Sequence, residues 1–502
     1  MSEATSQATE SKNGKTDNGR ATNGSANGSG AYAVAAPSLD AMLAAMKAAQ
    51  TKKGPPSYDE RIGNLERLER AVLQHKNALC DAISRDFGNR SKHETLIAEI
   101  FTTLNSIRHA KSHLHEWMDT EARPVIWSLM PARAAIQKQP LGVVGIISPW
   151  NYPVYLALDP LVGALAAGNR ALIKPSELTP QTSDLLKQLI GEVFEPEQVS
   201  VVTGGPEIGI AFSKLAFDHL VFTGSTSVGK LVMRAAAENL VPVTLELGGK
   251  SPAIVSDNFS LKSAAEKIIH GKLLNAGQTC IAPDYALVPK GRLDAFVEEL
   301  KAQVAAQYPR LESNPDYTSI ATQRHYDRLL GLITDAKEKG ATIVEANPAG
   351  ESLSSTSRKI APTFVVGATS DMTVMQDEIF GPILPVIGYG TLDEAIDFVN
   401  ERPRPLALYY FDHDDRRVQR VLDRTVSGGV TINDTLLHAG QEDLPFGGVG
   451  PSGIGHYHGV EGFETFTKKK PIFYQSRISG AGMLNAPYKK SLETMLRFLI
   501  GR

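Results

Sequence analysis

From residue 141 onward, short continuous apolar runs alternate with segments of helical periodicity. The first run, residues 143–147, reads Val-Val-Gly-Ile-Ile, which is the pattern of a strand buried on both faces of a sheet. Four similar runs follow, at residues 171–173, 199–202, 219–222 and 242–245. Five strands that alternate with helices predict an α/β fold with a Rossmann-like, doubly wound parallel sheet.

A second α/β pattern runs from residue 251 to about residue 450 and predicts a second α/β domain. Its expected strands lie at residues 251–255, 285–288, 342–345, 363–366, 407–411 and 429–432. Two extended runs, residues 124–129 and 133–139, predict a β-hairpin or crossover. Residues 463–474 predict a further extended segment at the periphery.

The region before residue 120 has the periodicity of helices. Ser57 and Glu60 have the spacing of a capping box, and a helical stripe follows them. Another long helix is expected over residues 93–117, with Ile97 among its inward-facing side chains. Residues 1–30 hold no side chain more apolar than alanine after Met1, so we predict a disordered tail there.

Composition narrows the class of protein. The chain of 502 residues is too long to fold around one ordinary hydrophobic core, and its 42% hydrophobic content is that of a globular protein. A formal net charge of -3 gives no general attraction to nucleic acid or to anionic membranes. Two cysteines and no uninterrupted apolar stretch of ~20 residues predict a cytoplasmic protein without disulfides or a membrane anchor. No metal site is predicted.

Cys280 is the first candidate for chemistry. It follows a turn-prone stretch, Asn275-Ala276-Gly277-Gln278-Thr279, and an apolar strand-like run comes after it. Reactive side chains are often presented on such loops, although a lone cysteine is more often a small buried hydrophobe. The second cysteine, Cys80, adjoins a helical apolar stripe, so we expect it to be buried in the core.

Other polar candidates follow the predicted strands of the first sheet. Asn151 comes after the first strand, Lys174 and Glu177 after the second, residues 224–229 after the fourth and Glu246 after the fifth. Ligands of open α/β sheets bind beyond the carboxyl ends of the strands, so this placement predicts a nucleotide site.

Each of these candidates has an alternative interpretation. The loop from Gly224 to Gly229 could bind a pyrophosphate at a helix N-terminus. Alternatively, its two glycines only allow the helix to pack against the strand. Glu177 could bind the ribose of NAD, where its charge would repel the 2′-phosphate of NADP. Alternatively, it only forms a solvent-exposed pair with Lys174. Glu246, at the end of a buried strand, could act as a general base or form a structural ion pair. Asn151 could be a positioned hydrogen-bond donor or part of an ordinary turn.

Six motifs occur in an order that resembles the aldehyde dehydrogenase superfamily. They are residues 149–151 (Pro-Trp-Asn), 174–177 (Lys-Pro-Ser-Glu), 222–226 (Phe-Thr-Gly-Ser-Thr), 245–250 (Leu-Glu-Leu-Gly-Gly-Lys), 277–280 (Gly-Gln-Thr-Cys) and 378–382 (Glu-Ile-Phe-Gly-Pro). The resemblance covers roughly residues 40–475. Residues 445–459 resemble the coniferyl-aldehyde dehydrogenase group, a relative of the fatty- and aromatic-aldehyde dehydrogenases.

The resemblance implies a role for each motif. Cys280 becomes the nucleophile, Glu246 the general base, and Asn151 with the Cys280 backbone N–H the oxyanion hole. The residues implied for NAD, with NADP as an alternative, are Lys174, Glu177, Gly224, Ser225, Gly229, Glu378 and Phe380. The implied reaction oxidises an aldehyde through a thiohemiacetal and a thioester to the carboxylic acid. CoA acylation and a catalytically silent homologue are the alternatives.

The resemblance also implies a domain plan. A tail at 1–30 would precede an NAD-binding domain of residues 31–123 and 141–248 and a catalytic domain of residues 249–450. Residues 124–140 and 460–480 would form a bridging or oligomerisation element of a homodimer or homotetramer. Coniferyl aldehyde, or another aromatic or fatty aldehyde, is the implied substrate.

Overall fold

The computed structural model describes residues 37–478, 482 and 484–501. The tail expected at residues 1–30 lies outside the described residues. The chain divides into two units, Met1–Ser38 and Leu39–Arg502, and the elements below belong to the second. Within the described part of the chain, no helix combines the length and the apolar character that a membrane crossing requires.

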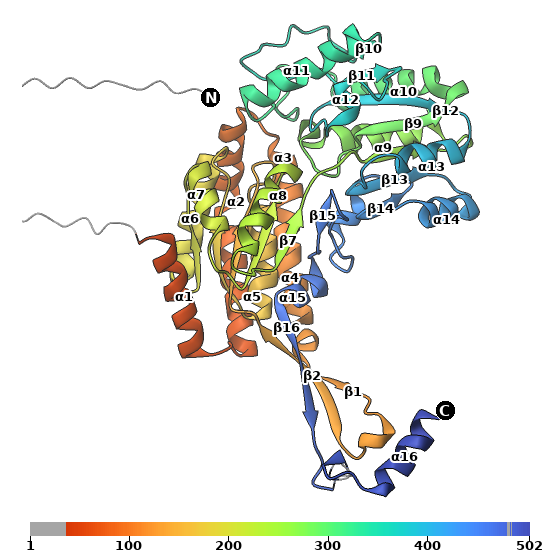
Figure 1. The fold of residues 1–502 in the computed structure, drawn as a ribbon. Helices are drawn as coiled ribbons and strands as arrows, with labels where there is room; N and C mark the ends of the chain where they lie inside the picture. Colours follow the sequence, from red (N-terminus) through yellow and green to blue (C-terminus); the bar gives the residue numbers. More distant parts are fainter. Residues whose placement is uncertain (1–36, 479–481, 483, 502) are drawn as a thin grey trace, which may run out of the picture. The chain divides into compact units, whose positions relative to one another are not determined.

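The first sheet has six strands in the order β15-β7-β6-β3-β4-β5 (Figure 1). Its five predicted strands are β3 (Val143–Ile147), β4 (Arg170–Lys174), β5 (Val199–Val201), β6 (His219–Thr223) and β7 (Val243–Glu246), and they are mutually parallel. The short β15 (Gly453–Ile454), which was not predicted, pairs antiparallel with β7 at the edge. The predicted fold class is confirmed.

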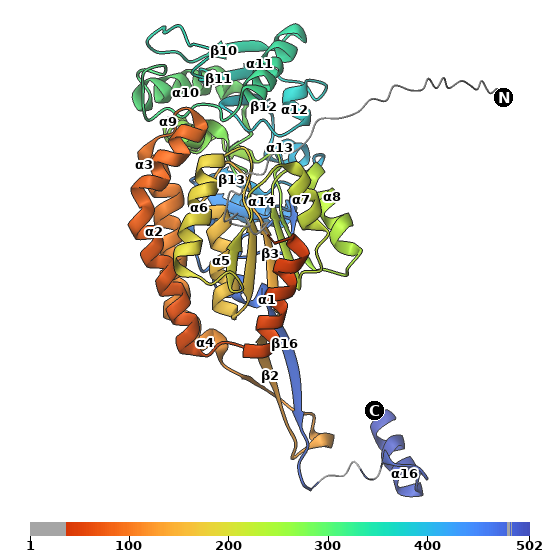
Figure 2. The same cartoon turned by 90° about the vertical axis from the view of Figure 1, so that its left-hand side faces the viewer.

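Helices cover both faces of this sheet, which explains the continuous apolar runs. Val144 and Ile146 of β3 pack with one layer of helices, whereas Val143 packs with the other. The first layer holds α2 (Tyr58–Phe87), α4 (Thr102–Met118), α5 (Tyr155–Ala167) and α6 (Pro180–Val193). The second holds α1 (Leu39–Lys53), α7 (Pro206–Ser213) and α8 (Thr226–Ala237) (Figure 2). The capping box of Ser57 and Glu60 at α2 is confirmed, and Cys80 is buried as predicted.

The second sheet has seven strands in the order β10-β11-β12-β9-β8-β13-β14, all parallel except β10. Six were predicted: β8 (Pro252–Val255), β9 (Tyr285–Pro289), β10 (Thr342–Glu345), β11 (Thr363–Val366), β13 (Ala407–Phe411) and β14 (Gly429–Ile432). The prediction missed β12 (Ile383–Tyr389), which lies between β11 and β9. Pro385 and Gly388 hide this strand, because both residues weaken a strand pattern.

Helices and short turns connect the strands of the second sheet. They are α9 (Leu261–Leu273), η3 (Leu274–Gly277), η4 (Lys290–Arg292), α10 (Leu293–Gln307), α11 (Gln323–Glu338), α12 (Thr373–Gln376), α13 (Leu392–Asn400) and α14 (Asp415–Arg424). The turn η5 (Leu437–Gly440) follows β14 and leads back to the first sheet. The chain continues with α15 (Gly459–Thr465) and ends with α16 (Lys490–Ile500).

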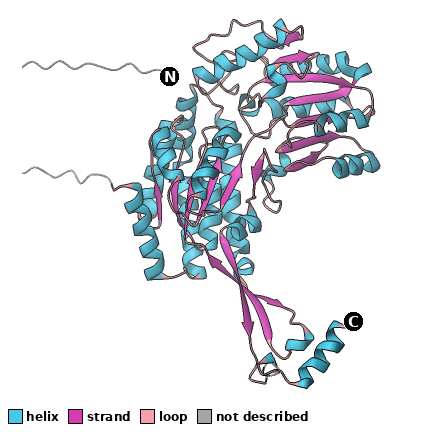
Figure 3. Ribbon diagram, in the orientation of Figure 1, coloured by secondary structure: helices cyan, strands magenta, loops and turns pink. Residues whose placement is uncertain are grey.

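A third, antiparallel sheet consists of β1 (Glu121–Arg123), β2 (Arg133–Pro140) and β16 (Thr467–Tyr474), in that order (Figure 3). The strand expected over residues 124–129 is wrong, because β1 precedes it and Trp127–Leu129 forms the 3-10 turn η2. The extended segment expected over residues 463–474 begins only at Thr467, after α15.

The helix expected over residues 93–117 is interrupted by a wider turn. α3 (Lys92–Thr95) passes into the π-helix η1 (Leu96–Phe101) before α4 begins. A π-turn holds more residues than an α-turn, so the 3.6-residue spacing cannot be extrapolated through it. The inward orientation expected for Ile97 is therefore wrong, and this side chain is 63% exposed.

Candidate active site

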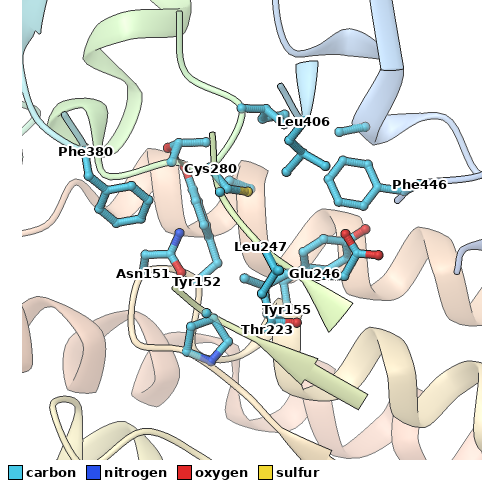
Figure 4. A pocket seen from close by; sticks show the side chains of 18 of the residues that line it. Asn151, Tyr152, Tyr155, Thr223, Glu246, Leu247, Cys280, Phe380, Leu406 and Phe446 are labelled. Atoms are coloured by element: carbon cyan, nitrogen blue, oxygen red, sulfur yellow. Dashed lines mark hydrogen bonds between the residues drawn. The ribbon is translucent and has the colours of Figure 1, made fainter. Parts of the chain in front are cut away.

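A cavity of about 390 Å³ collects most of the predicted site residues. Asn151, Glu246, Cys280 and Phe380 line it (Figure 4). Glu378 also belongs to the lining. Gly224 and Ser225 also line the cavity, whereas Lys174, Glu177 and Gly229 do not. Residues from the ends of β3, β6 and β7 thus meet the Cys280 turn and the segment before β12 in one space.

The Cys280 turn has a strained backbone. Asn275, Ala276 and Gly277 have φ values of 53°, 51° and 77°, a region that costs non-glycine residues about 1–2 kcal/mol each. Gly277 is required here, since an added Cβ would collide with the carbonyl oxygen of Gly381. Buried Gln278 stabilises the turn by donating from Nε2 to the Asn275 carbonyl, at 3.0 Å.

Asn151 lies against the same turn. Its Nδ2 donates to the carbonyl oxygen of Gln278 over 3.1 Å, and this amide group has a second N–H. The backbone carbonyl of Asn151 accepts hydrogen bonds from Arg90 Nη1 at 2.8 Å and from Asn275 Nδ2 at 3.0 Å. Asn151 is 4% exposed, so the side chain is held beside Cys280 by contacts on both ends of the residue.

A buried ion pair, which the sequence did not reveal, holds the loop that carries Asn151. Arg90 Nη1 and Glu99 Oε1 are 2.8 Å apart, and neither side chain is exposed. The other oxygen of Glu99 accepts the backbone N–H groups of Val154, at 2.7 Å, and Tyr155, at 3.2 Å. Glu99 therefore caps the N-terminus of α5, which begins at Tyr155, shortly after Asn151 in the chain.

The acids that face Cys280 are buried without full pairing. Neither oxygen of Glu246 has a hydrogen-bond partner among the described residues, and burial raises its pKa well above the usual range. Burial, with the charge of Asp284, raises the pKa of Glu378 to about 8. Burial, with Glu378 and Glu246 nearby, raises the pKa of the Cys280 thiol to about 12. The resting thiol is protonated at neutral pH and needs a proton acceptor to become a nucleophile.

Lys174 and Glu177 form a pair of their own outside the cavity. Lys174 Nζ donates to Glu177 Oε2 over 2.7 Å, and Lys174 is buried. Burial alone would raise the pKa of Glu177, but the hydrogen bond and charge of Lys174 outweigh it and lower the pKa. The carboxylate is therefore an anion at neutral pH.

The glycine loop combines both interpretations that its sequence allowed. Ser225 caps α8 by accepting the N–H of Val228 over 3.4 Å. An added Cβ on Gly229 would lie 2.7 Å from Leu247, so Gly229 serves the packing of α8. Gly224 and Ser225 nevertheless border the cavity at the N-terminus of α8, where the helix dipole favours an anion.

Two residues of α11 complete this part of the cavity and were not predicted. His325 stacks on Trp150 with ring centroids 4.8 Å apart, and Trp150 meets Phe380 edge to face at 5.5 Å. Arg328 donates to the carbonyl oxygen of Ile379 over 2.5 Å and so holds the segment between Glu378 and Phe380. Their sequence offers no motif, because α11 reads as an ordinary amphipathic helix.

A thiol, an amide donor and an unpaired carboxylate thus lie in one cavity, and these are the groups that nucleophilic catalysis at a carbonyl carbon requires. The model of the aldehyde dehydrogenase family matches residues 11–472, and the chain belongs to this family. Its members oxidise aldehydes with NAD or NADP. The predicted family is thus confirmed.

Relatives with assigned activities match almost the whole chain. A probable coniferyl aldehyde dehydrogenase of Caulobacter vibrioides is 52% identical over 461 residues, 91% of this chain and 95% of that protein. A coniferyl aldehyde dehydrogenase of Pseudomonas sp. is 47% identical over 93% of this chain and 97% of its own length. The Staphylococcus aureus protein AldH, solved in a substrate-bound state, is 41% identical with a TM-score of 0.87, covering 92% of this chain and 100% of that chain.

Replacement of Glu99 by Gln should destabilise the protein by about 3 kcal/mol, because it leaves the buried Arg90 without a counter-charge. The free energy of unfolding, from urea titration followed by tryptophan fluorescence, measures this loss. Glu298→Gln, which removes an exposed pair with Lys301, is the control and should change it by less than about 1 kcal/mol. Equal effects of the two substitutions would contradict the structural role of Glu99.

Proposed function

We propose that this enzyme oxidises coniferyl aldehyde, or a related aromatic or fatty aldehyde, to the carboxylic acid, with Cys280 as the nucleophile. The convergence of Cys280, Glu246 and Asn151 on one cavity carries this proposal. Trp150, Tyr152 and Tyr155 line the same cavity and give it an aromatic wall, which suits an aromatic substrate. The similarity to coniferyl aldehyde dehydrogenases supports the aromatic substrate.

The residues present fit the dinucleotide that the family uses. Glu378 Oε1 is buried without a hydrogen-bond partner among the described residues, and a ribose hydroxyl would supply the missing donor. Lys174 and Glu177 would hold the second ribose, with Gly224 and Ser225 near the pyrophosphate. When bound, the nicotinamide supplies the acceptor for the hydride.

An apolar surface for the adenine adjoins the Lys174–Glu177 pair. Ile210 of α7 and Leu231 of α8 are each 59% exposed, although both are large apolar side chains. The neighbouring Gly209 brings α7 so close to Lys174 that an added Cβ would lie 3.9 Å from its Cε. The ribose pair therefore lies next to the α7 segment that carries the exposed Ile210, as an adenosine would require.

The first chemical step uses Glu246 and Asn151. Because the Cys280 thiol is protonated at rest, Glu246 accepts its proton and the thiolate attacks the aldehyde carbon. The carbonyl oxygen becomes an alkoxide, which the free N–H of Asn151 and the backbone N–H of Cys280 stabilise. Loss of hydride from this intermediate leaves a thioester on Cys280.

The second step is hydrolysis. Glu246 first releases the proton of the thiol to solvent and then takes a proton from water. The resulting hydroxide attacks the thioester, the carboxylic acid leaves, and the Cys280 sulfur recovers its proton from Glu246. A CoA-acylating enzyme has no need for such a base. The buried, unpaired Glu246 therefore favours water over CoA as the acceptor, and a catalytically silent homologue would have no reason to retain it.

We assign the three sheets to three functional parts. The six-stranded sheet would carry the cofactor, the seven-stranded sheet the nucleophile, and the three-stranded sheet the contact between subunits. Among the described strands, β16 pairs only with β2, and its other edge suits strand addition by a second subunit in a homodimer or homotetramer.

Cys280→Ala should abolish aldehyde oxidation and leave NAD binding intact, because the thiol forms both covalent intermediates. NADH absorbance measures turnover, and quenching of tryptophan fluorescence measures binding of NAD. Cys80→Ala, in the core of the same chain, is the control and should retain activity. Retained turnover in the Cys280 variant would refute the assignment.

Glu246→Gln should slow both steps, and steady-state turnover more than thioester formation, because water is a weaker acid than the thiol and depends more on the base. Rapid mixing should therefore show a burst of NADH before slow turnover. In the wild-type enzyme, kcat should fall as the pH falls through the raised pKa of Glu246, because the protonated acid accepts no proton. Exposed Glu238→Gln is the control; equal loss of burst and turnover would limit Glu246 to activating the thiol.

The negative charge of Glu177 favours NAD over NADP, since a 2′-phosphate would lie beside it. Glu177→Gln should therefore raise kcat/KM for NADP relative to NAD by roughly tenfold, the change expected from about 1.4 kcal/mol of repulsion. Exposed Glu195→Gln should leave the ratio unchanged. A wild-type enzyme that prefers NADP would overturn the choice of cofactor.

A further inference from the structure

A buried hydrogen-bonded cluster borders the catalytic cavity but takes no part in the reaction described above. Tyr155 and Asp159 lie one turn apart on α5, and His458 reaches them from the residue before α15. Tyr155 Oη and His458 Nε2 are 3.0 Å apart, and Asp159 Oδ2 lies 3.4 Å from the same nitrogen. Ser106 of α4 donates to the other oxygen of Asp159 over 2.5 Å.

His458 is held in an unusual conformation for this contact. Its φ of 95° with ψ of 144° lies where L-residues rarely occur, at a cost of about 1–3 kcal/mol. The ring also stacks on Phe446, with centroids 5.1 Å apart and planes 19° apart. Tyr155, Phe446 and His458 all line the cavity, so the strained residue supports two aromatic parts of its wall.

The contacts of His458 determine where the hydrogen of Tyr155 points. With a hydrogen on Nε2, the N–H is donated to Tyr155 Oη, while the Nδ1 lone pair and Asp159 Oδ2, 3.4 Å from Nε2, have no hydrogen-bond partner among the described residues. With the hydrogen on Nδ1, a buried N–H would have no acceptor, and the Nε2 lone pair would face the Asp159 oxygen. The first tautomer is favoured, because unpaired buried donors are costly.

In this tautomer, the Tyr155 oxygen accepts from His458 and its own hydrogen stays free. Leu156, Ile281 and Leu436 make the cavity largely apolar near its aromatic wall, so a free hydroxyl there is a directional group for a substrate atom. Coniferyl aldehyde carries acceptor oxygens on its ring, whereas cinnamaldehyde, of the same skeleton, carries none.

We propose that Tyr155 is a specificity-determining residue, which donates a hydrogen bond to an oxygen substituent of the aldehyde. His458 and Asp159 are the positioning residues that keep its hydrogen free for the substrate. This inference rests on the proposed oxidation of aromatic aldehydes and adds the chemical group by which they are selected.

The test compares kcat/KM for coniferyl aldehyde and cinnamaldehyde, with full-length enzyme and NADH absorbance. Tyr155→Phe removes one oxygen atom and should lower the coniferyl-to-cinnamaldehyde ratio roughly tenfold, mainly through a higher KM for coniferyl aldehyde. His458→Phe keeps a stacked ring without the N–H and should lower the ratio similarly. His458→Gln keeps an N–H donor and should restore most of it; thermal unfolding verifies that each variant folds.

Three results would overturn parts of this scheme in different ways. An equal fall of kcat/KM for both substrates in Tyr155→Phe would make Tyr155 a wall without selectivity. A ratio altered in Tyr155→Phe but not in His458→Phe would remove the positioning role of His458. A wild-type enzyme that forms NADH with aliphatic aldehydes but with neither cinnamyl substrate would overturn the aromatic substrate class, and the inference with it.

Discussion

The buried carboxylate of Glu99 is the contact on which the catalytic loop depends. One of its oxygens pairs with Arg90, and the other receives two backbone N–H groups at the start of α5. Arg90 in turn donates to the carbonyl of Asn151. A single acid thus connects the helix layer of the first sheet to the amide that we propose to stabilise the alkoxide, and the position of that amide depends on the rigidity of the core.

The chemistry uses acids that would destabilise an ordinary core. Glu246 and Glu378 are buried, and each has at least one oxygen without a hydrogen-bond partner among the described residues. Their raised pKa values follow from that burial, and so does the protonated state of Cys280. The strained φ values of Asn275 and Ala276 add a further cost at the same place. Stability is lower where the reaction occurs, as is common for active sites.

The sequence predicted the parts of this fold that local patterns encode. Five strands of the first sheet were found because burial on both faces makes each a continuous apolar run. The positions of Asn151 and Glu246 followed, since strand ends of a parallel sheet meet at one edge. Pro385 and Gly388 concealed β12, and the π-turn of η1 misplaced Ile97.

Contacts between distant segments left no local signal. Arg90 meets the carbonyl of Asn151 across 61 positions, and Tyr155 meets His458 across 303. Neither segment carries a mark of such a partner, because an arginine in the loop after α2 or a tyrosine at the start of α5 is ordinary in sequence. The candidate nucleophile, base and cofactor residues were thus predictable, whereas the residues that hold them were not.

The π-helix η1 has a consequence for how this cavity can vary. Ala98 lines the cavity from η1, and Thr102 does so from the first residue of α4, while Ile97 and Phe101 are exposed on the other side. The extra residue of the wide turn decides which side chains face inward, and the flanking helices keep their own packing. If η1 were one residue shorter or longer, different side chains of this segment would face the cavity, although no residue had been substituted. At this wall, the number of residues in the chain is itself a determinant of cavity shape.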